Sequence, residues 1–208
     1  MPPNPFRDAM METDPWLERW LPLMAETAVD ATVLELGCNA GRDTARLAEA
    51  GFRVVGTDIS AEALQACHHA VPSALLLRHD LHEPLPFADA SFGVIVASLC
   101  LHYFAWEETR GIVADIHRCL SPGGVMLCRV NSVRDVHYGA DGTVALEPNY
   151  YLVDGRHSNR KRFFDRAAID ALFGPEWERI AVEEMEINRY DKPKVVWEMV
   201  LRKAGARR

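Results

Sequence analysis

The stretch from residue 33 to residue 51, VLELGCNAGRDTARLAEAG, constrains the fold of this chain more than any other. A short apolar run contains the acid Glu35, a loop of small residues follows, and a helical pattern then continues to Gly51. In open α/β sheets, ligands lie outside the carboxyl ends of the strands. We therefore expect a nucleotide-like ligand over this loop.

The same alternation of apolar runs and helical patterns continues along the chain. It predicts strands at 31–36, 53–58, 74–80, 91–99 and 125–131, and helices at 41–51, 60–70 and 106–120. Ser60 is the expected N-cap of the second helix. Strands that alternate with helices imply a parallel sheet with right-handed crossovers. The strands are continuous apolar runs, which is typical of a sheet with helices on both faces.

The pattern changes after Asn131. Residues 132–164 are polar and aromatic, and we expect a loop there. A helix is predicted at 165–173, followed by extended runs at 179–187 and 194–202. Because the connection between these two runs is short, they should form an antiparallel pair. A parallel sheet finished by an antiparallel hairpin differs from the dehydrogenase pattern.

Composition excludes several classes of partner. The formal net charge of -7 argues against the nucleic-acid backbone as a main partner, since such domains are usually strongly basic. No secretory signal pattern and no apolar run of about 18 residues is present, so no membrane partner is expected. The five cysteines are widely spaced without a C-x-x-C motif, which predicts free thiols and a cytoplasmic protein.

The glycine loop departs from the dinucleotide fingerprint G-x-G-x-x-G, whose three positions fall on Gly37, Asn39 and Arg42. Asn39 can still adopt a left-handed backbone, but Arg42 does not suit close contact between helix and strand. Glu35 would repel a pyrophosphate and would suit an ammonium group. Asp58 ends the second strand, where an acid accepts hydrogen bonds from ribose hydroxyls. S-adenosylmethionine has the ribose and the positive charge, and it has no phosphate.

Several segments together resemble the class I S-adenosylmethionine-dependent methyltransferases. VLELGCNAG is similar to their first motif, VVGTDIS to the second, and LLRHDLHEPLPFADASFGVIVASLCLHYF to the third region and fourth strand. IHRCLSPGGVML is also typical of them. The resemblance covers roughly residues 30–130. It implies a Rossmann-like fold with a seven-stranded, mostly parallel sheet in the order 3-2-1-4-5-7-6, in which the hairpin supplies the last two strands.

The resemblance also implies a role for individual residues. The cofactor would be S-adenosylmethionine, the product S-adenosylhomocysteine, and no metal is expected. Residues implied in cofactor binding are Glu35, Gly37, Cys38, Asn39 and Gly41 around the methionine end, Asp58 at the ribose, Ile59 at the adenine, Asp80 and Leu81 near the adenine amino group, and Ser98 and Leu99 beside the methyl group. Two histidine pairs, His68 with His69 and His79 with His82, lack the further ligands that a metal site needs.

Methyl transfer from a sulfonium is an in-line displacement, so the protein mainly aligns the two reactants. A general base is needed only if the acceptor must lose a proton. The sequence shows no catalytic triad, and the catalytic residues stay unassigned. The candidates are His102, Tyr103, Tyr151 and Arg162.

Residues 132–164 are too long for a simple connector and are expected to bind or cover the acceptor. Their basic side chains would favour an anionic acceptor; the alternative is a solvated basic loop over aromatic packing. The aromatic and basic residues concerned are His137, Tyr138, Tyr150, Tyr151, His157, Arg160, Lys161 and Arg162. This segment resembles, more weakly, the tellurite-resistance-type methyltransferases, which favours a small-molecule acceptor.

With 208 residues, the chain is long enough for one well-buried domain. We expect a lead-in helix within 1–30, with Asp14 as N-cap and Pro15 at its first position, a donor-binding core at 31–131, an acceptor or lid segment at 132–164, and a helix and hairpin at 165–208. We expect a monomer or homodimer. Two other functions stay open, namely a non-catalytic S-adenosylmethionine or S-adenosylhomocysteine binder and a nicotinamide-dependent dehydrogenase.

Overall fold

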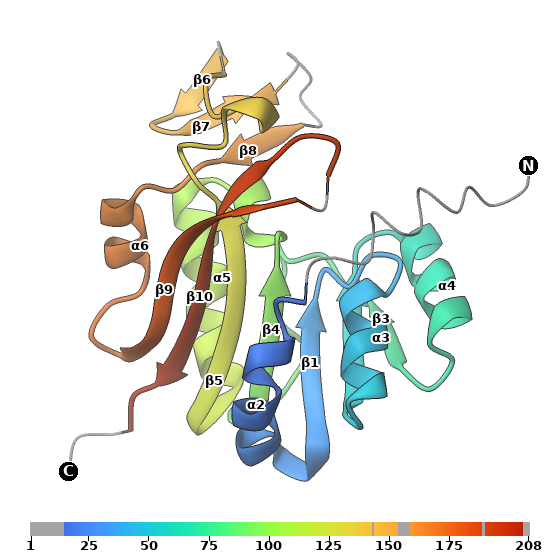
Figure 1. Cartoon of the computed structure of the whole chain (residues 1–208). Helices are drawn as coiled ribbons and strands as arrows, with labels where there is room; N and C mark the ends of the chain where they lie inside the picture. The colour runs from blue at the N-terminus through green and yellow to red at the C-terminus, as the bar shows by residue number, and fades with distance from the viewer. Residues whose placement is uncertain (1–14, 143, 154–158, 189, 206–208) are drawn as a thin grey trace, which may run out of the picture.

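The computed structural model describes residues 15–142, 144–153, 159–188 and 190–205. Its centre is a seven-stranded sheet in the order β3-β2-β1-β4-β5-β10-β9 (Figure 1). The strands are β1 (Thr32–Leu36), β2 (Arg53–Asp58), β3 (Leu75–Arg78), β4 (Phe92–Ser98), β5 (Leu120–Asn131), β9 (Trp177–Ile187) and β10 (Lys194–Lys203). Strand β10 is antiparallel to both β5 and β9, whereas the other neighbours are parallel. The predicted strand order and the antiparallel hairpin are confirmed.

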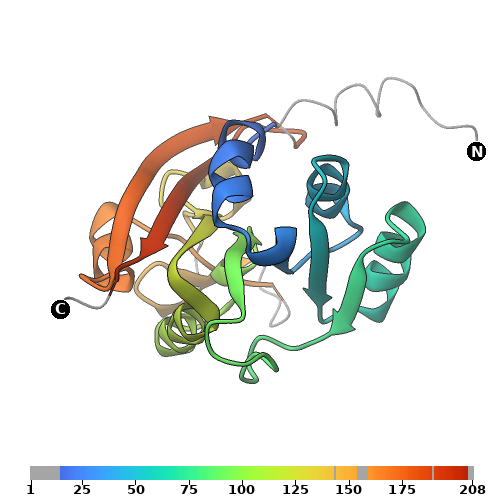
Figure 2. The same cartoon turned by 90° about the horizontal axis from the view of Figure 1, so that it is seen from below.

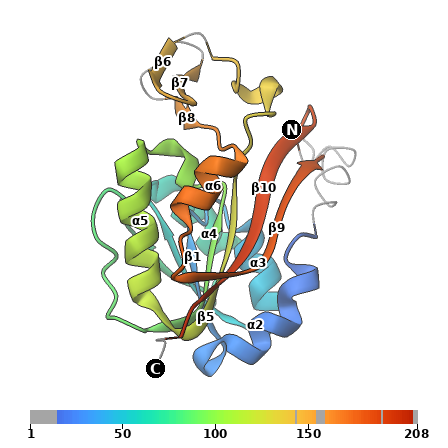
Figure 3. The ribbon, with the colours of Figure 1, turned by 90° about the vertical axis from the view of Figure 1, so that its left-hand side faces the viewer.

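Helices cover both faces of the sheet, as the apolar strands predicted. They are α2 (Leu21–Thr27), α3 (Arg42–Glu49), α4 (Ala61–Ala70), α5 (Trp106–Cys119) and α6 (Arg166–Leu172). Figure 2, seen from below, and Figure 3 show α2 and α3 on one side of the sheet and α5 and α6 on the other. One apolar cluster joins Met24 and Leu47 to β1, and the second joins Ile116 and Ile169 to the opposite face.

The helix starts follow local capping chemistry. The Ser60 hydroxyl accepts a hydrogen bond from the Ala63 N–H at 3.1 Å, so the predicted cap of α4 is confirmed. Asp165 caps α6 in the same way through the Ala168 N–H. The lead-in helix begins later than predicted, with a 3-10 turn at Glu18–Trp20 before α2. The predicted cap Asp14 lies outside the described residues.

The prediction of a loop over 132–164 is wrong. The segment contains a 3-10 helix (Val136–Tyr138) and a second, antiparallel sheet of β6 (Val144–Glu147), β7 (Tyr150–Leu152) and β8 (Arg160–Arg162). These strands have three or four residues and no clear apolar alternation, so the sequence carries little strand signal. Figure 1 shows this second sheet beyond the carboxyl ends of β4 and of the other parallel strands.

Strand β5 is also longer than the predicted 125–131. It already pairs with β4 at Leu120, and its register shifts across the SPGG turn before regular pairing resumes at Val125. Within the described ranges, no helix is both long and apolar enough to cross a membrane.

Candidate functional site

The register of the sheet brings three strand ends to one edge. Leu36, the last residue of β1, pairs with Thr57 of β2 and with Ala97 of β4. Because the three strands are parallel, the loops that follow them leave the sheet side by side. These loops carry most of the residues predicted to bind the cofactor.

The loop between β1 and α3 has a backbone that few residues tolerate. Gly37 and Gly41 have φ angles of +68° and +87°, and an added Cβ would lie 2.7 Å from Cys100 Cβ and from Cys67 Sγ, respectively. Asn39 adopts the left-handed φ of +50° that the sequence allowed. Both glycines are therefore required for backbone angle and for space, and the loop is held in one shape.

Asp58 holds this loop to the end of β2. One carboxylate oxygen accepts a hydrogen bond from the Asn39 N–H at 2.9 Å, and the other accepts from the Ser60 N–H at 2.9 Å. The next side chain, Ile59, is 55% exposed and is free to pack against a flat ligand. Asp58 thus orders the glycine loop in addition to the ribose role that the sequence implies.

Glu35 is a buried acid on β1. Its side chain is 4% exposed, and one carboxylate oxygen accepts a hydrogen bond from the Thr44 hydroxyl of α3 at 2.6 Å. Burial, with a smaller contribution from the negative charges of Asp43 and Asp58, raises the pKa of Glu35 to about 8, although the hydrogen bond from Thr44 acts in the opposite direction. Among the described residues Glu35 makes no ion pair. A cationic ligand at this edge would supply the missing positive charge.

Three further residues predicted to bind the cofactor follow strands β3 and β4, and each has its own local contacts. Asp80 accepts a hydrogen bond from the His82 N–H at 3.0 Å and lies 2.7 Å from His82 Nδ1; these contacts lower the pKa of Asp80. Leu81 packs against the core. Leu99 has a left-handed φ of +57°, which is strained for this residue type. Its N–H donates to the Arg129 carbonyl at 2.9 Å, which holds the turn after β4.

Two of the candidate catalytic residues lie in the short helix after β4 (Leu101–Tyr103). His102 is buried, and burial together with Lys194 and Lys161 lowers its pKa well below the usual value. Tyr103 is half-exposed, and burial of its hydroxyl group raises its pKa. His102 is therefore neutral and Tyr103 protonated near pH 7.

The other two candidates lie in the second sheet. Arg162 forms an ion pair with Glu147 and donates a hydrogen bond to the Phe104 carbonyl at 3.3 Å. Its guanidinium carbon also lies 5.5 Å from the ring centroid of Trp106 on α5, so Arg162 joins the second sheet to the main domain. Tyr151 packs on Phe163, with ring centroids 6.1 Å apart. The structure does not bring these two side chains into contact with the glycine loop.

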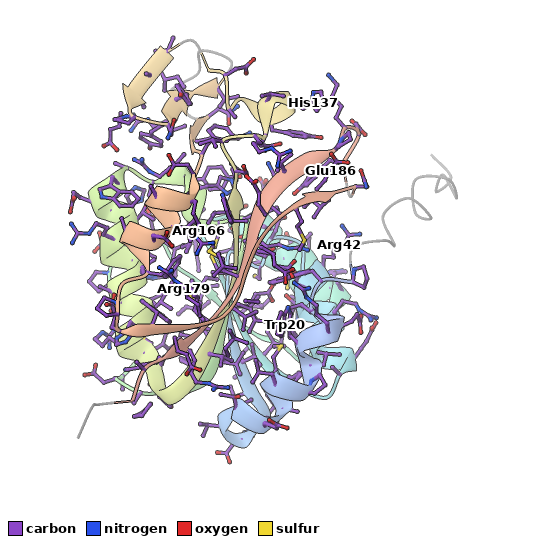
Figure 4. The ribbon with its side chains drawn as sticks, turned by 60° about the vertical axis from the view of Figure 1, so that its left-hand side comes forward. Trp20, Arg42, His137, Arg166, Arg179 and Glu186 are labelled. Carbon is purple, nitrogen blue, oxygen red and sulfur yellow. The ribbon has the colours of Figure 1, made fainter. Side chains whose placement is uncertain are left out.

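Among the remaining aromatic and basic residues of 132–164, Tyr150 donates a hydrogen bond to the Tyr103 carbonyl at 3.0 Å, and Lys161 is near enough to His102 to lower its pKa. Tyr138 donates a hydrogen bond to the Lys192 carbonyl at 3.0 Å, and His137 lies at the outer side of the segment (Figure 4). His157 lies outside the described residues. Within the described ranges, no group of three or more His, Cys, Asp or Glu side chains is arranged to hold a metal ion.

Sequence reasoning missed a buried charge pair on the same sheet face as Glu35. Arg129 of β5 donates to Glu198 of β10 through two nitrogens, at 2.9 and 2.7 Å. The Trp16 ring lies over the guanidinium at 4.5 Å, and its indole N–H donates to Asp43 at 3.1 Å. An arginine and a glutamate inside otherwise apolar strands were the available signal.

Sequence reasoning also missed Asn131, the last residue of β5. Its side chain is 0% exposed, and neither the amide nitrogen nor the amide oxygen has a hydrogen-bond partner among the residues that the structure describes. The buried hydroxyl of Ser98, at the end of β4, lacks a partner as well. Orphaned buried polar groups are rare in native structures and call for a specific explanation.

Comparison with known proteins agrees with this geometry. Residues 33–124 match the model of a methyltransferase domain family. A methyltransferase of Synechocystis sp. is 38% identical over 93 residues, which are 45% of this chain and 43% of the relative. Trans-aconitate 2-methyltransferase of Azoarcus sp. is 35% identical over 108 residues, 50% of this chain and 41% of the relative. The chain thus matches less than half the length of these curated relatives.

Solved structures extend the similarity to nearly the whole chain. A methyltransferase of Methanosarcina mazei, described as S-adenosylmethionine-dependent, superposes with a TM-score of 0.75 at 18% identity, covering 88% of this chain and 98% of that one. The 1,6-didemethyltoxoflavin N1-methyltransferase of Burkholderia thailandensis was solved with bound 1,6-didemethyltoxoflavin and S-adenosylhomocysteine. It superposes with a TM-score of 0.67 at 20% identity, covering 94% of this chain and 79% of that one.

Residues 33–124 therefore match a methyltransferase domain family, and the chain has the class I methyltransferase fold. The class uses S-adenosylmethionine as its methyl donor. This supports S-adenosylmethionine as the cofactor of the site at the β1 and β2 ends.

Proposed function

We propose that this chain is an S-adenosylmethionine-dependent methyltransferase that acts on a small-molecule acceptor by in-line transfer. The observation that carries the proposal is Glu35, a buried acid without an ion-pair partner among the described residues, beside a glycine loop fixed in shape. A ligand that brings an ammonium group would complete this site. The match of residues 33–124 to a methyltransferase domain supports the same ligand.

The residues fit the donor at three points. The Glu35 carboxylate would bind the α-ammonium group, with the Thr44 hydroxyl fixing its orientation. Asp58 would accept hydrogen bonds from the ribose hydroxyls while it still accepts the hydrogen bond from the Asn39 N–H. Ile59 would pack against the adenine, because its apolar side chain is exposed there. The sequence-based assignments of Cys38, Asp80, Leu81, Ser98 and Leu99 to this pocket stay predictions.

The bound sulfonium supplies an activated methyl group with a neutral leaving group. The task of the chain is then to bind and orient the two reactants. His102 is neutral near pH 7, because burial lowers its pKa. It is therefore able to accept a proton at a ring nitrogen if the acceptor must lose one. Tyr103 is next to it in the chain and can donate a hydrogen bond through its protonated hydroxyl.

A small acceptor is supported by the second sheet, which lies beyond the carboxyl ends of the parallel strands, where it could cover a bound acceptor (Figure 1). The 1,6-didemethyltoxoflavin N1-methyltransferase among the structural neighbours carries a small molecule in its crystal structure. We also propose that residues 1–208 form one domain, as a monomer or homodimer. A cytoplasmic location is proposed because the five cysteines are all unpaired thiols.

Parallel calorimetric titrations with S-adenosylmethionine, S-adenosylhomocysteine and NAD test the proposal. Micromolar affinity for the first two ligands and none for NAD is the expected result. Binding of NAD alone would contradict the proposal and indicate a nicotinamide-dependent dehydrogenase. Donor binding without release of S-adenosylhomocysteine across a broad acceptor screen would instead identify a non-catalytic binder.

A further inference from the structure

Two orphaned polar side chains lie on neighbouring strands at the carboxyl edge of the sheet. They are Ser98, whose buried hydroxyl ends β4, and Asn131, whose amide ends β5. The Asn131 side chain is fully buried, with its donor and its acceptor both unsatisfied. A buried amide without partners costs stability and is retained only where something offsets the cost.

The two side chains face the donor side of the molecule. Side chains alternate between the faces of a strand, and Val96 of β4 and Leu127 of β5 belong to the apolar cluster under α2 and α3. Ser98 and Asn131 follow them at even spacing and therefore lie on that face. Glu35 pairs in register with Val96 and contacts Thr44 of α3, so it lies on the same face.

Three positive charges near this edge are each paired with an acid among the described residues. Arg129, which lies two residues before Asn131 in β5 and on the same face, is paired with Glu198. Lys194 is paired with Asp135 at 2.6 Å, and both side chains are buried. In the second sheet, Arg162 is paired with Glu147. These three cations are therefore engaged with acids, and what Ser98 and Asn131 themselves offer a ligand is hydrogen bonds.

We propose that Asn131, assisted by Ser98, recognises the methyl acceptor, and that the acceptor is an uncharged molecule whose edge carries an N–H next to a carbonyl. Lactams, carboxamides and amino-substituted heteroaromatic rings belong to this class. An amide side chain offers one acceptor beside two donors, and such an edge satisfies both kinds of group. A carboxylate only accepts, so it would leave the Asn131 oxygen buried without a partner. This inference rests on the proposed methyltransferase function.

The aromatic surroundings fit the same class. Tyr103 follows β4 and is 49% exposed, and the Tyr190 side chain is near enough to raise its pKa. Exposed aromatic rings beside a polar floor are suited to stacking on a planar ligand. The acceptor would thus lie flat against aromatic groups while its polar edge reaches Asn131.

The test uses the full-length protein saturated with S-adenosylhomocysteine and two matched pairs of probes. The pairs are nicotinamide with nicotinate and 4-hydroxybenzamide with 4-hydroxybenzoate, each titrated by calorimetry. We expect the amide of at least one pair to bind at least tenfold more tightly than its acid, and Asn131→Ala to abolish that preference. The exposed Asn188→Ala is the control and should change nothing.

A second measurement separates recognition from a structural role. Asn131→Leu replaces the amide with an apolar group of similar size, and we expect an unchanged or higher melting temperature, with affinity for S-adenosylhomocysteine within twofold of the parent. A loss of more than about 5 °C would show that the amide supports the fold and would overturn the proposal.

The outcomes distinguish this inference from the function on which it rests. If the parent protein does not bind S-adenosylhomocysteine, the proposed function fails. If it binds S-adenosylhomocysteine but prefers the acids, or binds neither member of either pair, only the acceptor class is overturned.

Discussion

Two strand regions on one face of the sheet differ in whether a buried charged side chain has an ion-pair partner. On β1, Glu35 is buried with no ion pair among the described residues, and its pKa is raised to about 8. On β5 and β10, Arg129 and Glu198 are buried just as deeply but are joined by two hydrogen bonds. A satisfied pair supports the structure, whereas an uncompensated acid is a site that a cationic ligand can complete.

This comparison predicts opposite responses to mutation. Arg129→Met should have the largest effect, because it leaves Glu198 buried with the half-exposed Arg19 as its one remaining ion-pair partner among the described residues. We expect a loss of about 3–5 kcal/mol of unfolding free energy in urea denaturation. The double variant Arg129→Met with Glu198→Leu should recover most of it. If the single variant is as stable as the parent, the pair is not structural.

Glu35→Gln should make the protein more stable than the parent at high pH, where the parent carries a buried charge that is unpaired among the described residues. Because the folded-state pKa of Glu35 lies above the unfolded value of about 4.3, its contribution to stability is fully present only below the unfolded value and is lost as pH rises towards 8. The unfolding free energy of the parent should therefore fall by about 3 kcal/mol relative to Glu35→Gln between pH 5 and pH 8. Parallel urea denaturation curves with no such divergence would show that Glu35 is ionised in the free protein.

Asp58→Ala should weaken binding of S-adenosylmethionine by about 1–3 kcal/mol, because it removes a charge-assisted hydrogen bond and releases the Asn39 N–H. Calorimetric titration measures this directly. Asp170→Ala, an exposed acid on α6, serves as the control for a lost carboxylate. Equal affinities for the parent and Asp58→Ala would remove Asp58 from the donor site.

Ser60→Ala should have the smallest effect. Loss of the cap on α4 should lower the unfolding free energy by about 1 kcal/mol in urea denaturation. Donor affinity should change by less than twofold, because the Asp58 carboxylate accepts from the Ser60 backbone N–H, which the variant keeps. A tenfold loss of donor affinity would mean that the hydroxyl itself contacts the ligand.

The sequence predicted the half of the molecule whose signals are local. The strand runs and the cap at Ser60 depend on residues close together in the chain, and these predictions were confirmed. The left-handed Asn39 also follows from residue type. Contacts between distant residues were not predictable in this way, since Arg129 and Glu198 are separated by 69 positions.

The second sheet also could not be predicted from the sequence, because its strands depend on contacts with distant residues. Strand β8 reads RKR, which has no apolar alternation, and it is held in place by packing of Arg162 against Trp106 and Tyr150. The orphaned amide of Asn131 is equally invisible in sequence, because only the fold shows that nothing satisfies it. The proposed acceptor side of the site therefore depends on tertiary structure, while the proposed donor side follows from short motifs.

The most direct test of the account is the number of protons released when S-adenosylhomocysteine binds, measured by calorimetry at pH 7 in buffers of different ionisation enthalpy. Glu35 is mostly protonated before binding and should ionise against the ligand's ammonium group, so about one proton should be released by the parent and none by Glu35→Gln. Tight binding with no proton release, and equal affinity in Glu35→Gln, would contradict the assignment of Glu35 to the donor.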